Sequence, residues 1–182
     1  MREKFSSFQR STLLLCFFAY ASAYTGRLNL SAALPGLRGS IAISDVQAGL
    51  FQTVFALVYA AGQIINGLLA DKINVRLSIA AGLAASAVCN ALFGLNSSFA
   101  LLLALWGLNG AAQSMLWTPI VKLVAERFSG HARDRASFVL SITVIFGHFI
   151  AWAISGTLAS VLSWRYSFLI PAFIMAIAGV IV

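Results

Sequence analysis

Charged side chains are scarce in this sequence. Only 9% of its residues are Asp, Glu, Lys or Arg, only five are acidic, and 60% are hydrophobic. The mean hydropathy is +0.92. This composition excludes an ordinary soluble domain and predicts an all-α, polytopic membrane protein. The apolar segments contain no carboxylate pair, no nucleophile beside a base and no set of metal ligands, so we expect no enzyme activity, no metal and no cofactor.

Cysteine is also rare. The chain has two, Cys16 and Cys89, and both fall within predicted helices. Buried thiols of this kind usually act as small apolar packing groups, so we expect no disulfide. His131 lies in a basic loop, too far in sequence from other potential ligands to suggest a metal site.

Six apolar runs are long enough to cross the ~30 Å hydrocarbon layer as helices. Polar residues or Gly and Pro separate the runs. The predicted helices cover residues 12–37, 46–70, 75–95, 99–124, 136–162 and 164–182. Because the connections are short, no extramembrane domain is available to hold a functional site, and any function must lie between the helices.

Basic residues gather in alternate connections. Nine precede the first helix or lie in the second-to-third and fourth-to-fifth connections: Arg2, Lys4, Arg10, Lys72, Arg76, Lys122, Arg127, Arg133 and Arg135. The opposite side has only Arg38 and Arg165. By the positive-inside rule, the N-terminus is expected in the cytoplasm, with the chain in a plasma membrane such as a bacterial inner membrane. The net charge of +7 is then a topology signal, so we expect no nucleic-acid partner.

The first predicted helix carries an arginine near its middle, Arg27. A cation at this depth costs at least ~2.5 kcal/mol unless it faces a polar cavity or a counter-charge. Tyr20, Tyr24 and Ser31 share its helical face. The five acidic residues all fall in loops or at predicted helix ends. Two interpretations follow, a structural pair with a carboxylate or a site for an anion in a central cavity, and we favour the anion site.

Polar side chains also follow one face of three other predicted helices. Their spacing predicts that they line a cavity shared with Arg27. The alternative is that single amides and hydroxyls bond neighbouring helices together, each adding about 0.6 kcal/mol. The residues are Gln52, Tyr59, Gln63 and Asn66 on the second helix, Asn109, Gln113 and Trp117 on the fourth, and Ser137, Ser141, His148 and Trp152 on the fifth.

The connection between the second and third helices reads GLLADKINVR from Gly67 to Arg76. It resembles the cytoplasmic motif of the major facilitator superfamily, and the resemblance covers nearly the whole chain. The resemblance implies that Gly67, Asp71, Lys72 and Arg76 form a gating motif whose charges bridge neighbouring helix ends. The alternative is a solvated loop. Asn74 stands where the motif usually has glycine, so we expect a left-handed turn there.

Three short motifs narrow this resemblance. They are Tyr20-x3-Tyr24-x2-Arg27-x-Asn29, Gln113-x3-Trp117-x-Pro119, and Trp164-Arg165-Tyr166 followed by Pro171-Ala172-Phe173. Together they resemble the organophosphate:phosphate antiporter family. In that family the arginine matching Arg27 binds the anionic group of the substrate, and a second arginine comes from the C-terminal half. The resemblance therefore implies a substrate site centred on Arg27.

Other residues are expected around this arginine. Tyrosines and a histidine line the family's site, and amides and a tryptophan shape the cavity. The expected substrate-binding residues are Tyr20, Tyr24, Arg27, Gln63, Gln113, Trp117 and His148. His148 lies mid-helix, where it can carry a proton or donate to the anion, and the alternative is a bond to a neighbouring helix.

Two departures from the family pattern bear on the substrate. Phosphate-ester members commonly have lysine directly after the arginine and another lysine on the second helix, whereas this chain has Leu28 and Gln63. Less positive charge favours a monoanion, such as a sugar acid or other carboxylate, over an organophosphate.

The length of the chain bears on its function. The family has twelve helices in two halves with substrate bound between them, and these 182 residues supply six. We expect a fragment that lacks the C-terminal half, the alternative being pairing with itself or a second chain. The predicted function is half of a secondary active transporter that moves small organic anions across the lipid bilayer by alternating access. The alternative is a transporter-like membrane sensor that binds the anion without moving it.

Overall fold

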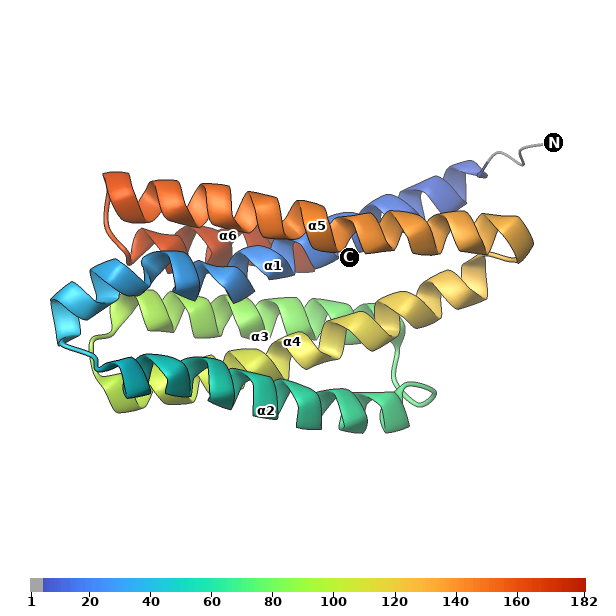
Figure 1. Ribbon diagram of the computed structural model, residues 1–182. Coiled ribbons are helices and arrows are strands. Elements are labelled where there is room, and N and C mark those ends of the chain that lie inside the picture. Colours follow the sequence, from blue (N-terminus) through green and yellow to red (C-terminus); the bar gives the residue numbers. More distant parts are fainter. Residues whose placement is uncertain (1–4) are drawn as a thin grey trace.

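The computed structural model describes residues 5–182 and forms six helices there (Figure 1). They are α1 (Ser7–Ile41), α2 (Asp45–Leu69), α3 (Val75–Leu95), α4 (Phe99–Arg127), α5 (Gly130–Val161) and α6 (Tyr166–Ile181). The helices α2 to α5 are long and apolar enough to cross a membrane, and α6 is an apolar helix of 16 residues. The predicted all-α class with six helices is confirmed. Arg2, Glu3 and Lys4, which entered the charge argument, lie outside the described residues.

Polar caps set where the first two helices begin. Ser6 accepts a hydrogen bond from Gln9 N at 3.2 Å, and the Gln9 side chain accepts one from Ser6 N at 3.1 Å. Ser44 and Gln47 form the same reciprocal pair before α2. These pairs satisfy backbone N–H groups that a helix leaves without partners. For this reason α1 begins at Ser7, more than one turn before its apolar run.

Two predictions at helix starts are wrong. Asn74 has a φ of −64°, not a left-handed conformation, and its side chain accepts bonds from the backbone N–H groups of Arg76 and Leu77. It therefore caps α3, as asparagine commonly does. The fifth helix begins at Gly130, which has a positive φ of 50°. Arg133, expected in a loop, consequently lies in the first turn of α5.

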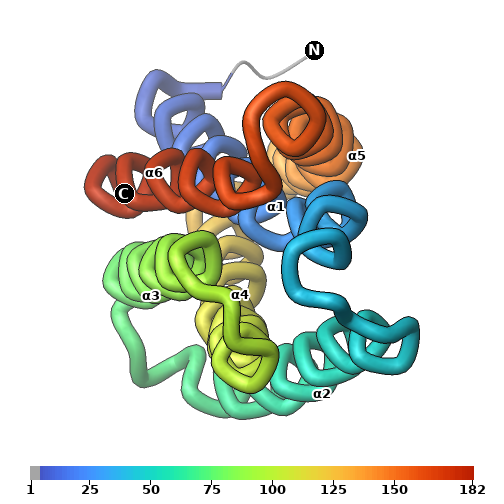
Figure 2. Tube along the Cα trace, turned by 90° about the vertical axis from the view of Figure 1, so that its left-hand side faces the viewer, coloured from blue at the N-terminus to red at the C-terminus, as the bar shows by residue number. Residues whose placement is uncertain are grey.

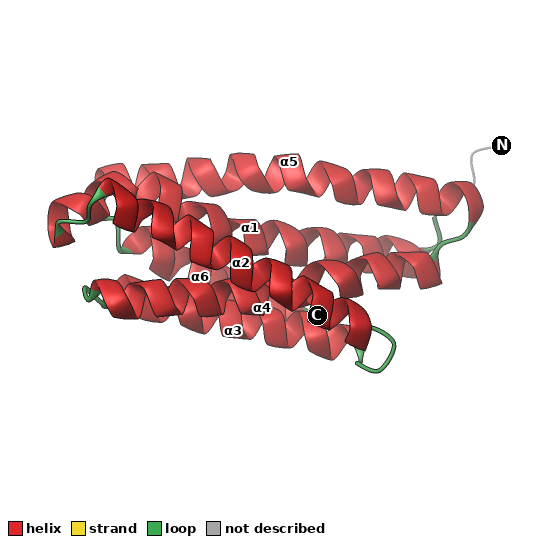
Figure 3. Ribbon diagram, turned by 60° about the horizontal axis from the view of Figure 1, so that its bottom comes forward, coloured by secondary structure: helices red, strands yellow, loops and turns green. Residues whose placement is uncertain are grey.

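The two ends of the bundle differ in charge. Figure 1 shows the start of α1, the α2–α3 connection and the α4–α5 connection at one end, and the other three connections at the opposite end. Arg38 and Arg165 lie at the second end, and the other basic residues that the structure describes at helix termini and in connections lie at the first. All connections are short (Figure 3).

The helices form two groups that lie against each other (Figure 2). The first has α1 packed on α5 and α6, the second has α4 packed on α2 and α3, and α3 packs on α6 between them. The pattern of contacts has an internal symmetry in which α1, α2 and α3 correspond to α4, α5 and α6. Under this correspondence the pair α1–α5 matches α4–α2, and the pair α3–α4 matches α6–α1. Because α1 and α4 run in opposite directions (Figure 1), the two triplets are related as an inverted repeat.

A buried amide network ties the triplets together. Asn29 of α1, Asn90 of α3 and Asn109 of α4 are each at most 1% exposed. Asn29 Nδ2 donates to Asn90 Oδ1 at 2.8 Å, and Asn109 Nδ2 donates to the Gly26 carbonyl at 2.9 Å. The expectation that the four polar faces together line a cavity therefore does not hold for Asn109, and the alternative of a single amide that bonds neighbouring helices does, because this amide is enclosed between helices and satisfies a buried carbonyl.

The close contact of α2 with α4 gives a test of this packing. A Cβ on Gly110 would lie 2.8 Å from the Phe55 carbonyl oxygen, whereas one on Gly156 would meet no atom within 4 Å. Gly110→Ala should lower the free energy of unfolding by about 1–3 kcal/mol. Gly156→Ala should leave it unchanged or raise it by up to about 1 kcal/mol. Thermal unfolding in detergent measures both, and equal melting temperatures for the two variants would contradict the packing.

Candidate functional site

Arg27 lies near the middle of α1, partly buried, and no described carboxylate pairs with it. Its Nε donates to Oε1 of Gln113 on α4 at 2.8 Å. Its Nη2 is buried and bonds to none of the described residues. A buried donor without a partner costs about 1–3 kcal/mol, and more when it is charged. This nitrogen is therefore placed to donate to an acceptor from outside the described chain.

Three aromatic rings surround the guanidinium of Arg27. Its Cζ lies 4.5 Å from the ring centre of Tyr59, 5.2 Å from that of Tyr24 and 5.7 Å from that of Phe55. Such contacts each stabilise a cation by about 0.5–2 kcal/mol, more where water is excluded. Tyr59 belongs to the predicted polar face of the second helix, but neither it nor Phe55 is among the expected site residues. Phe55 has no polar group that would mark it in the sequence.

Gln113 of α4 fixes the orientation of the Arg27 guanidinium. It is fully buried, so it does not face a cavity as expected. Its Nε2 donates to the Ala23 carbonyl at 3.1 Å and to Ser86 Oγ at 3.2 Å. Because the groups around Nε2 are acceptors, the amide is fixed with Oε1 toward Arg27. The orientation of the guanidinium is thus set by helix packing.

Aromatic rings from three helices form a wall beside the guanidinium. The Tyr20 ring centre lies 4.9 Å from that of Trp117 and 5.1 Å from that of Tyr24. The Tyr24 ring centre lies 4.7 Å from that of His148. His148 is exposed, and its Nδ1 lies 2.7 Å from the Val144 carbonyl of its own helix, not from a neighbouring one. The wall brings together expected site residues of α1, α4 and α5.

Gln63 reaches the cluster through Tyr59. Its Nε2 donates to Tyr59 Oη at 2.7 Å, and its Oε1 accepts a bond from Thr118 Oγ1 at 3.1 Å. Since Tyr59 Oη accepts from Gln63, its own proton is available to another group. Gln63 therefore orients Tyr59 over the arginine, and the structure brings all seven expected site residues into one connected cluster.

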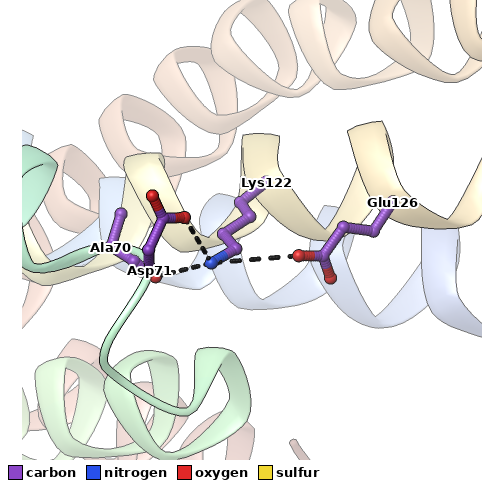
Figure 4. A network of polar contacts seen from close by, with 4 residues as sticks. All are labelled: Ala70, Asp71, Lys122 and Glu126. Carbon is purple, nitrogen blue, oxygen red and sulfur yellow. Dashed lines mark hydrogen bonds and ion pairs between the residues drawn. The ribbon is translucent and has the colours of Figure 1, made fainter.

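A lysine of α4 holds the connection between α2 and α3. Figure 4 shows Lys122 directed at the end of α2. Its Nζ bonds the Ala70 carbonyl at 2.7 Å and the Asp71 carboxylate at 2.9 Å, with Glu126 at 3.9 Å. The lysine thus satisfies a carbonyl at the helix end and neutralises the neighbouring acid.

The expected gating motif is only partly engaged. Of its residues, Asp71 alone forms an ion pair within the described chain. Lys72 and Arg76 are exposed and do not bridge helix ends there. Gly67 is exposed, and a Cβ on it would meet no atom within 4 Å. The cation that bridges to the end of α2 is Lys122 of α4. It lies outside the motif, so the motif's sequence does not predict it.

The fold and this cluster define a class of protein, a helical membrane bundle built as an inverted repeat with a cation held between the repeats. Residues 16–182 match the sequence profile of the Major Facilitator Superfamily. The chain belongs to the Major Facilitator Superfamily. This is a family of transporters and not of enzymes, as predicted.

Curated relatives narrow the resemblance. The chain is 28% identical over 165 residues to a probable hexose phosphate transport protein of Chlamydia muridarum, covering 91% of this chain and 36% of that protein. It is 28% identical over 171 residues to the glycerol-3-phosphate transporter of Bacillus subtilis, covering 91% and 38%. It is 30% identical over 110 residues to the membrane sensor protein UhpC of Escherichia coli, covering 60% and 25%. The predicted resemblance to organophosphate:phosphate antiporters is confirmed, and the chain spans less than half the length of these relatives.

A solved structure supports the fold. A bacterial homologue of the human lysosomal transporter Spinster, in an inward-facing and occupied conformation, has a TM-score of 0.85 at 20% identity. The match covers 98% of this chain and 44% of that chain. The six helices therefore correspond to about half of that fold.

The role of Gln113 is testable through stability. Gln113→Leu removes the acceptor for Arg27 and the donor to Ala23, so it should lower the free energy of unfolding by about 1–3 kcal/mol. Gln52→Leu, at an exposed position of α2, should change it by less than about 0.5 kcal/mol. Thermal unfolding of the two variants in detergent makes the comparison. Similar values for both would show that the Gln113 amide does not hold the arginine.

Proposed function

We propose that this chain is the N-terminal half of a secondary active transporter for small organic anions. We place it in a plasma membrane, a bacterial inner membrane in particular, with its N-terminus in the cytoplasm. The observation that carries the proposal is the Arg27 guanidinium, which has a buried nitrogen without a partner and no described carboxylate beside it. Membership of a transporter family supports the same function.

In the proposed mechanism an anion completes the Arg27 site. It accepts from Nη2 and neutralises the guanidinium, while the Tyr59 hydroxyl donates a further bond. The anion then bridges this half to the one outside the chain, so that the two halves close around it. Binding shifts the population between outward-open and inward-open states by its differential affinity for them. The Lys122–Asp71 pair joins α2 to α4 on the cytoplasmic side and serves as a gate.

The charge of the cluster favours a monoanion. Among the described residues, Arg27 is the cation that contacts the rings of Tyr24, Phe55 and Tyr59. Gln63 is neutral and engaged with Tyr59, and Leu28 is partly buried against the apolar core. One positive charge from this half matches a sugar acid or other carboxylate. Relatives named as hexose phosphate and glycerol-3-phosphate transporters point to phosphate esters, and we treat these as the competing substrate class.

A sensor is the second candidate function. It is favoured by the 30% identity to a membrane sensor protein over 110 residues. The same cluster would bind the anion, and the change of state would pass to a partner protein without transport.

The site is tested by removing the arginine. Arg27→Ala should weaken anion binding by about 10- to 100-fold, since a hydrogen bond to a charged group contributes about 1.5–3 kcal/mol. Arg38→Ala is a matched control on the same helix, because Arg38 pairs with Asp45 at an exposed end. Binding is measured by calorimetry on the full-length protein in detergent. Unchanged affinity in a folded Arg27→Ala variant would exclude the assignment.

Transport is tested with labelled anions. Vesicles carrying the chain joined to its downstream sequence, and vesicles carrying the 182 residues alone, are supplied with sugar acids and sugar phosphates. Uptake of sugar acids by the longer protein is the expected result. Uptake of sugar phosphates only would overturn the substrate class, and binding without uptake would favour the sensor.

A further inference from the structure

A row of polar side chains on α5 leads from the charged end of the bundle to the arginine cluster. Arg133, Ser137, Ser141 and His148 follow one another at intervals of four, four and seven residues, which keeps them on one helical face. All four are exposed. At 1.5 Å per residue the row is about 22 Å long. It therefore runs from the end with the α4–α5 connection (Figure 1) to the depth of the rings beside Arg27.

A cavity accompanies this row. It has a volume of about 260 Å³, lies between α4 and α5, and is lined by Arg133, Ser137, Ser141 and Trp117 together with apolar side chains. Trp117 is in ring contact with Tyr20 at 4.9 Å. The inner end of the cavity thus adjoins the aromatic wall of the arginine cluster, although neither His148 nor Arg27 lines it.

Arg133 is fixed at the outer end of the cavity. Its Nε donates to the Phe128 carbonyl at 3.0 Å, and its Nη2 donates to the Ala125 carbonyl at 3.0 Å. These carbonyls end α4, so the guanidinium is held by the helix terminus and not by a carboxylate. The nearby acid Asp134 lies 3.7 Å from His131. The remaining N–H groups of Arg133 are left to donate to an anion.

We propose that this cavity is a second anion-binding station, on the cytoplasmic side of the Arg27 site. Arg133 attracts a small organic anion or inorganic phosphate, and Ser137 and Ser141 rotate their hydroxyls to donate hydrogen bonds to it. The anion then moves along the polar row of α5 to the arginine cluster. The proposal rests on the proposed transport of anions and adds the route by which the anion reaches Arg27. The competing occupant of the cavity is the apolar surface of the transporter's other half.

The test uses cysteines as local probes of charge and access. Ser137→Cys, Ser141→Cys and Ser160→Cys are prepared in the full-length protein in detergent. Ser160 is the matched control, since it is exposed on the same helix near its other end and its hydroxyl also bonds its own backbone. Within these 182 residues the native thiols, Cys16 and Cys89, are buried and so react slowly. Rates are measured with sulfonatoethyl methanethiosulfonate, which is negative, and trimethylammonioethyl methanethiosulfonate, which is positive.

For each cysteine we take the ratio of the rate with the negative reagent to the rate with the positive reagent. This ratio should be at least about fivefold higher at positions 137 and 141 than at position 160, because one nearby positive charge in water attracts the negative reagent and repels the positive one by about this factor. Arg133→Gln should remove this difference and Arg133→Lys should keep it, which separates charge from the loss of the α4 contacts. Gluconate and glucose 6-phosphate should each slow the reaction at position 137.

Other outcomes overturn the station. Unreactive cysteines at positions 137 and 141 would mean that the other half of the transporter covers the cavity. Equal rate ratios at the three positions would mean that no anion is attracted there. The reagent preference should persist in an Arg27→Ala background, so failure of the Arg27 site and failure of this station give different results.

Discussion

Keeping a guanidinium charged between the helices of an apolar bundle is the constraint on which the centre of this structure depends. In a membrane-spanning helix, an arginine at the centre of the bilayer costs at least about 2.5 kcal/mol. Here the charge is held by one amide oxygen, from Gln113, and by the faces of Tyr24, Phe55 and Tyr59. None of these groups is negative, so they stabilise the cation without neutralising it. Arg27 therefore keeps its attraction for an anion from outside the described chain.

The bonds that orient this arginine also join the two helix triplets. Helices α1 and α4 each pack mainly on other helices. Polar bonds nevertheless cross between them, from Gln113 to Arg27 and to the Ala23 carbonyl, and from Asn109 to the Gly26 carbonyl. In a membrane the hydrophobic effect contributes little to helix association, so such bonds and close packing decide how helices meet. The same contacts therefore set the geometry of the site and hold the two helix triplets together.

The parts of this structure that the sequence predicts are properties of single segments. Six apolar runs, alternating charge and a mid-helix arginine each follow from local composition and period. Which face meets which neighbour is not local. Periodicity places Asn109 on a polar face but does not tell a buried network from a cavity, and Phe55 carries no polar atom to mark it beside Arg27. The Lys122–Asp71 pair spans 51 positions in sequence, so no motif contains both partners.

Helix α4 connects the arginine cluster to the end of α2, and it does so across a proline. Gln113 lies before Pro119 and Lys122 lies after it. Pro119 has no N–H to donate to the carbonyl of Met115, one turn earlier. Ser78 of α3 donates its hydroxyl to that carbonyl at 3.1 Å, so the break leaves no buried group unsatisfied. The two parts of α4 thus lack one backbone bond between them, which is where a proline commonly kinks a helix, and this position lies between the amide that holds the arginine and the lysine that holds the end of α2.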